Sequence, residues 1–122
     1  MAGRFRLYTD ADIRGQIVEG LIRRGWDVVR AVDAFREKTK DPVHFAEAAR
    51  QGRVLVAHDI HQLKLALDWL EQRRSFTGFL TWPQLRQKEW SDGVIVEAFE
   101  DLAQEDDPFP KAYPIRYLKP RI

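Results

Sequence analysis

The chain has 122 residues, of which 44 % are hydrophobic and 32 % are charged, and its formal net charge is +1. This length predicts a single domain over residues 1–122, and the composition excludes a disordered chain. No apolar run reaches the roughly 18–20 residues of a membrane-spanning helix, so we expect a cytoplasmic protein without a membrane partner. Cysteine is absent, which excludes disulfides, thiolate zinc sites and cysteine nucleophiles.

Short apolar segments alternate along the chain with segments whose apolar residues recur at helical spacing. Asp10 or Asp12 can cap the first helix, Gly25 is placed to end it, and Asp41-Pro42 is typical of an N-cap followed by a first helical proline. The predicted strands cover residues 5–9, 26–29, 54–57, 78–81 and 114–118. The predicted helices run from Asp12 to Gly25, from Asp41 to Gly52, through Leu63–Leu70 and from Ser91 to Gln104, whereas residues 30–40 show no clear pattern.

The alternation of strands and helices determines the fold class. Strands separated by helices pair in parallel through crossover connections, which are right-handed in nearly all proteins. We therefore predict a three-layer α/β/α fold with a mostly parallel sheet of four to five strands. Ligands of such sheets bind beyond the carboxyl ends of the strands, so we expect a functional site at that edge.

Four aspartates fall at this predicted edge. Asp10 and Asp12 follow the first strand, Asp41 opens the helix after the second, and Asp59 follows the third. Converging carboxylates repel one another unless they share a cation, and Mg²⁺ prefers oxygen ligands. Helix capping is an equally good explanation for Asp12 and Asp41, and a weaker one for the other two.

Four stretches of the sequence, in this order and spacing, resemble PIN-like domains. They are LYTDADI at residues 7–13, LIRRGWDVV at 21–29, AARQGRVLVAHD at 48–59 and FTGFL at 76–80. The corresponding family patterns are L-L-D-E-N-V, L-R-x-x-G-H-D-V, A-x-x-x-G-R-V-L-V-T-R-D and H-A-G-I-I. Together with the late helix, the resemblance covers nearly the whole chain.

The resemblance implies a ribonuclease that depends on Mg²⁺ or Mn²⁺ and cleaves RNA. PIN-like proteins include the toxin halves of bacterial toxin–antitoxin pairs, so an antitoxin or another protein partner is implied as well, and a homodimer is left open. Matched position by position, Asp10, Asp41 and Asp59 would be the catalytic and metal-binding acids. From its place just beyond these acids, Arg14 is a candidate phosphate-binding residue.

Two positions depart from the family pattern. Ala11 and His61 stand where the family often has acids. His61 is a candidate replacement ligand, and Asp12 is a second accessory residue. The reduced acidic set keeps an alternative open, in which the chain is a catalytically weak or inactive PIN-like module that acts by binding a protein partner.

A receiver-like signalling domain is a less favoured alternative. Such domains are doubly wound and of this size, and they carry acids after the first and third strands, a hydroxyl after the fourth and a lysine after the fifth. This sequence has matching residues in the same order, namely Asp10, Asp12, Asp59, Thr81 and Lys119. A clear helix beyond Lys119 is missing from the pattern.

Overall fold

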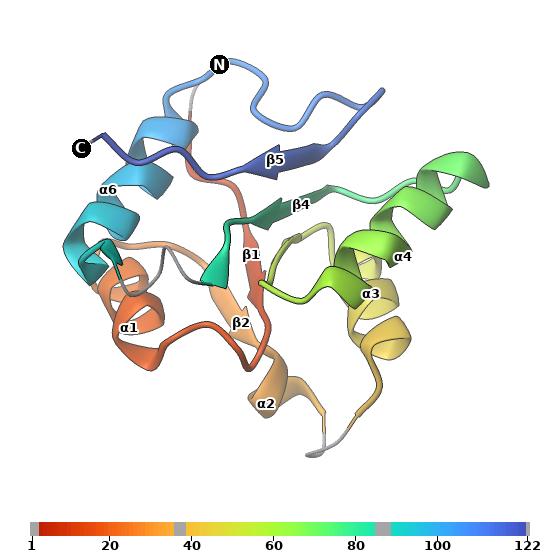
Figure 1. The fold of residues 1–122 in the computed structure, drawn as a ribbon, viewed down its shortest axis with the longest axis horizontal. Coiled ribbons are helices and arrows are strands. Elements are labelled where there is room, and N and C mark those ends of the chain that lie inside the picture. Colours follow the sequence, from red (N-terminus) through yellow and green to blue (C-terminus); the bar gives the residue numbers. More distant parts are fainter. Residues whose placement is uncertain (1–2, 36–38, 85–88, 122) are drawn as a thin grey trace.

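Five short parallel strands form the centre of the structure, a computed structural model that describes residues 3–35, 39–84 and 89–121 (Figure 1). The strands are β1 (Leu7–Thr9), β2 (Val28–Arg30), β3 (Val54–Val56), β4 (Gly78–Thr81) and β5 (Ile115–Tyr117). They pair in the order β2-β1-β3-β4-β5, and every described pair is parallel. The predicted α/β fold class is confirmed.

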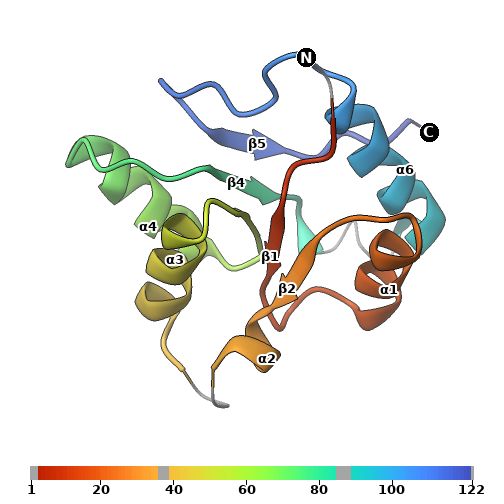
Figure 2. The ribbon, with the colours of Figure 1, turned by 180° about the vertical axis from the view of Figure 1, so that it is seen from behind.

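Helices cover both faces of this sheet. They are α1 (Gly15–Arg23), α2 (Ala31–Ala34), α3 (Asp41–Arg50), α4 (Ile60–Glu71) and α6 (Asp92–Ala103). In the two opposite views, α1 and α6 lie together on one side, and α3 and α4 lie together on the other (Figures 1 and 2). Among the described residues, no helix is both long enough and apolar enough to cross a membrane.

The strands are apolar on both faces, as expected for a parallel sheet that is covered on both sides. Along β1, Leu7 packs into the cluster under α1 and α6, whereas Tyr8 packs into the cluster under α3 and α4. The same alternation separates Val54 and Val56 from Leu55 in β3. All five of these side chains are at most 1 % exposed, so β1 and β3 are fixed in the core.

The crossover from β4 to β5 departs from the sequence prediction. The chain moves outward from β1 to β2 with α1 on one face, and it moves in the opposite direction from β4 to β5 with α6 on that same face. Two crossovers that move in opposite directions over the same face must have opposite hands. The uniform right-handed winding that the sequence analysis assumed is therefore wrong for this last unit.

The start of α1 also differs from the prediction. Neither Asp10 nor Asp12 caps this helix: its N-cap is Arg14, and no side chain makes a capping hydrogen bond there. In the patternless stretch, the described residues form one short helix, α2, directly after β2. At the other end of the chain, the tentative strand at 114–118 is confirmed as the edge strand β5.

Gly78, the first residue of β4, allows the chain before β5 to approach the sheet. A Cβ atom at this position would lie 2.7 Å from Cδ1 of Phe109, whose ring packs edge-on against Phe5. We expect Gly78→Ala to lower the free energy of unfolding by about 1–3 kcal/mol in urea denaturation, because the ring must move. Gly15→Ala is the matched control, since nothing lies within 4 Å of its added Cβ. An equal effect of the two substitutions would contradict the close approach.

Candidate functional site

The carboxyl ends of β1 and β3 lie side by side at the point where the strand order reverses. From β1 the chain continues to β2 on one side, whereas β3 and β4 lie on the other. In doubly wound sheets this divergence opens the crevice in which ligands bind. Asp10 is the first residue after β1, and its backbone N–H donates to the Val56 carbonyl oxygen at 2.9 Å. Asp59 follows β3 and begins the turn into α4.

Asp41 and Asp59 meet at this edge. Asp41 is the first residue of α3, one position later than the N-cap that the sequence predicted, because Lys40 is the N-cap. Burial, the nearby Asp59 and Asp10 charges and a hydrogen bond to the Asp59 side chain all raise the pKa of Asp41. Asp59 itself caps α4, where it accepts the His61 backbone N–H at 2.8 Å. The two carboxyl groups therefore share a proton or require a cation.

Asp12 joins the loop after β1 to the loop after β3. Its Oδ2 accepts the backbone N–H of His58 at 3.1 Å, and its Oδ1 is buried without a hydrogen-bond partner. Burial and the nearby Asp10 charge raise the pKa of Asp12 to about 6, and the hydrogen bond from His58 offsets part of this shift. Asp12 was expected to serve mainly as a helix cap, and this expectation is wrong.

His58 is oriented by β4. Its Nδ1 lies 2.7 Å from the carbonyl oxygen of Trp82, and its ring meets the Trp82 indole edge-on. A carbonyl oxygen only accepts, so Nδ1 carries the hydrogen of this bond. The sequence analysis treated His58 as a solvent-facing loop residue. The signal that would have placed it is its position directly after a buried strand, next to Asp59.

The cation nearest to Asp10 in its pocket is Arg30, which the sequence analysis missed. A pocket of about 210 Å³ beside β1 is lined by Thr9, Asp10, Ala11, Ile13, Gly15, Val18, Arg30 and Val32. The predicted phosphate-binding residue, Arg14, instead pairs with Asp92 of α6. Arg30 is the last residue of β2 and thus at the same sheet edge as the acids, which is the sequence signal that could have identified it.

His61 and Gln62 complete the surroundings of the acids. His61 is exposed, and its proximity favours the charged form of Asp41. Gln62 is fully buried, its Nε2 lies 3.5 Å from the Asp41 carbonyl oxygen, and its Oε1 has no partner. Gln62 was missed because the helix was assigned from its apolar residues alone, although a polar residue on the buried face of α4 is a recognisable signal.

The acids crowd one another without forming a closed ligand set. Within the described ranges, no three acidic or histidine side chains are grouped as a bound metal ion requires. The donor chemistry nevertheless suits a hard divalent cation, because carboxylate oxygens from three chain segments face one crevice and the Asp12 Oδ1 is unpartnered. An ion there would have to draw Asp10 closer to the Asp41–Asp59 pair.

Comparison of this chain with protein-family models, with curated proteins and with solved structures gives no match.

We predict that Asp12 weakens the fold at neutral pH. An acid whose pKa is raised in the folded state supports folding below its unfolded value near 4, and this support is lost as the pH rises through about 6. Asp12→Asn should therefore raise the free energy of unfolding at pH 7 by about 1–2 kcal/mol, after allowance for partial exposure. The gain should shrink toward zero at pH 4.

Urea denaturation of both proteins across this pH range measures the effect. Asp106→Asn is the control, because Asp106 is an exposed loop residue at the other end of the sheet. A variant that is equally or less stable than the wild type at pH 7 would show that Asp12 is not under electrostatic strain.

Proposed function

We propose that this chain is a metal-dependent ribonuclease of the PIN-like type. The observation that carries the proposal is the contact between the Asp41 and Asp59 carboxyl groups, beside Asp10, at the carboxyl ends of β1 and β3. Mutual repulsion at such a site is relieved by a divalent cation, and Mg²⁺ and Mn²⁺ match the oxygen donors. The toxin role and its antitoxin partner remain predictions from the sequence resemblance.

In the proposed mechanism, Asp10, Asp41 and Asp59 hold the ion. When bound, a divalent ion supplies an activated water and stabilises charge on the attacking and leaving oxygens of a phosphodiester. Arg30 lines the same pocket as Asp10, so its guanidinium is placed to bind a non-bridging phosphate oxygen. Asp12 positions the loop that carries Asp59 through its bond to the His58 N–H.

A second candidate is the catalytically weak binding module. It is supported by the lack of a closed ligand set among the described acids and histidines, together with Ala11 and His61 at positions where acids were expected. The two candidates differ in one measurable property: the nuclease must bind a divalent cation at this edge, whereas the module need not.

The receiver alternative has support from the strand order, which is that of flavodoxin-like sheets. The last crossover argues against it. In a doubly wound sheet with uniformly right-handed connections, the helix before β5 would cover the same face as α3 and α4. Instead, α6 packs against α1 on the opposite face.

We predict that Mn²⁺ or Mg²⁺ stabilises the folded protein. An ion that binds only the folded state adds about 2.7 kcal/mol at one hundred times its dissociation constant, which raises Tm by several degrees. Thermal melts with and without millimolar ion measure this shift. The shift should vanish in Asp59→Asn and persist in the control Asp106→Asn. An unchanged Tm with both ions would favour the binding module.

We predict that the purified protein cleaves single-stranded RNA, and faster with Mn²⁺ than with Mg²⁺, because Mn²⁺ tolerates a nitrogen ligand such as His61 better. Asp10→Asn should abolish cleavage without loss of fold, because Asp10 lies at a sheet edge outside the core. Asp106→Asn should cleave like the wild type. Cleavage that survives Asp10→Asn would mean a contaminating nuclease or a different site.

A further inference from the structure

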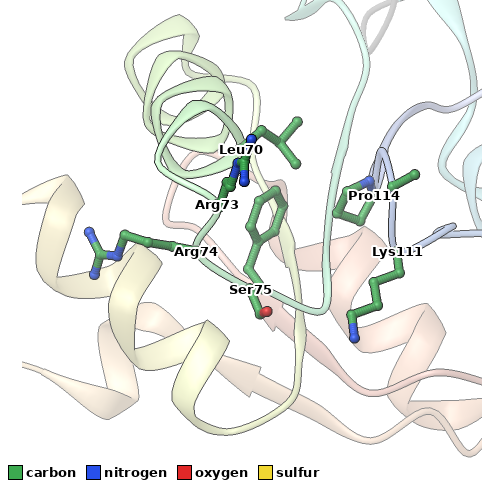
Figure 3. Close-up of a pocket in the computed structure, with 8 residues that line it drawn as sticks. Leu70, Arg73, Arg74, Ser75, Lys111 and Pro114 are labelled. Atoms are coloured by element: carbon green, nitrogen blue, oxygen red, sulfur yellow. The ribbon is translucent and has the colours of Figure 1, made fainter.

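A second pocket lies at the opposite end of the sheet from the acids. It has a volume of about 230 Å³ and sits between the C-terminal end of α4 and the segment before β5 (Figure 3). It is lined by Leu70, Arg73, Arg74, Ser75, Phe76, Lys111, Ala112 and Pro114. These residues precede β4 and β5, so the pocket borders the amino ends of the strands. None of them takes part in the nuclease proposed above.

The charge of this pocket is positive and unbalanced. Eight arginines elsewhere in the described structure form ion pairs with carboxylates. Within the same described ranges, neither Arg73 nor Lys111 forms one. The Arg74 guanidinium stacks over the Trp69 ring at 3.7 Å and extends away from Lys111 (Figure 3). The pocket therefore presents two available cations beside the hydroxyl of Ser75.

Arg73 occupies a backbone position that favours glycine. Three helices end with the same pair of hydrogen bonds, in which the residue after the cap donates three residues back and the next residue donates five back. Gly25 ends α1 and Gly52 ends α3, with φ of +94° and +67°. At the end of α4 the same position is Arg73, with φ of +58°, the one positive value outside glycine among the described residues.

An arginine here weakens the fold, because its Cβ is crowded in the left-handed conformation. The chain places glycine at two equivalent positions, so the exception calls for a role of the Arg73 side chain. An arginine fork matches the oxygens of a phosphate group, and a lysine and a hydroxyl add further donors. The remaining wall is apolar and comes from Leu70, Phe76 and Pro114.

We propose that this pocket binds the phosphate group of a small phosphate monoester with an apolar substituent. Arg73, Lys111 and Ser75 bind the phosphate oxygens, and the apolar wall contacts the substituent. The volume is too small for a whole nucleotide-sized or drug-sized ligand, which occupies about 300 Å³ or more. It suits a phosphate group with a few carbon atoms.

The test is a titration of the isotope-labelled protein with inorganic phosphate and with phenyl phosphate, followed by the amide signals of residues 70–77 and 111–114 in NMR spectra. We expect both to shift these signals, and phenyl phosphate to bind about threefold or more tightly, because its ring covers apolar surface. A short oligouridylate should leave these signals unchanged. No shift with either phosphate, or a shift with the oligonucleotide alone, would overturn the proposal.

Arg73→Gly separates the binding role from the structural cost. We expect this variant to raise Tm by about 3 °C, since the left-handed strain is removed, and to weaken phenyl phosphate binding about tenfold or more. Lys111→Gln should weaken binding without raising Tm. Arg23→Gln, which removes an exposed arginine of α1, is the control and should bind like the wild type. Unchanged affinity in Arg73→Gly would overturn the assignment, and RNA cleavage is not needed for any of these readouts.

Discussion

The pairing of β1 with both β2 and β3 is the constraint on which the rest of the structure depends. Tyr8 stands opposite Val29 on one side and Leu55 on the other, so the central strand has no free edge. Because its residues are buried on both faces, the register cannot slip without moving apolar side chains out of the core. The residues that follow β1 and β3 are thereby brought to one place, although almost 50 positions separate Asp10 from Asp59 in the chain.

The chain departs from its own local rules at the two ends of this sheet. At the carboxyl end, Asp12 keeps a buried oxygen without a partner, and Asp41 lies against another acid. At the amino end, Arg73 stands where two other helices have glycine. Elsewhere the described arginines are largely paired with carboxylates. Strained and unpaired groups persist where the surrounding structure fixes them, and they concentrate at binding sites.

The sequence predicts the strands well because buried parallel strands have a simple signal. Runs such as Val54-Leu55-Val56 are apolar on both faces, and glycines mark the ends of α1 and α3. The hand of the last crossover has no such signal. It follows from which sheet face α6 covers, and both faces of the sheet are equally apolar.

The aspartates show the same division between local and tertiary signals. Their common edge follows from the alternation of strands and helices, but their individual partners do not. Asp12 contacts the His58 N–H rather than a helix end, and Asp59 rather than Asp12 caps a helix. Arg30 became visible only when the register placed the end of β2 beside Asp10.

The central claim is that the crowded acids at the carboxyl edge form a divalent cation site. Anomalous diffraction from crystals grown with Mn²⁺ tests it most directly, because the peak locates the ion without reference to activity. We predict a peak between Asp10 and the Asp41–Asp59 pair, with the three carboxylates within about 2.2 Å of the ion. Asp41 and Asp59 bonded only to each other, with no peak at this edge in saturating Mn²⁺, would contradict the account.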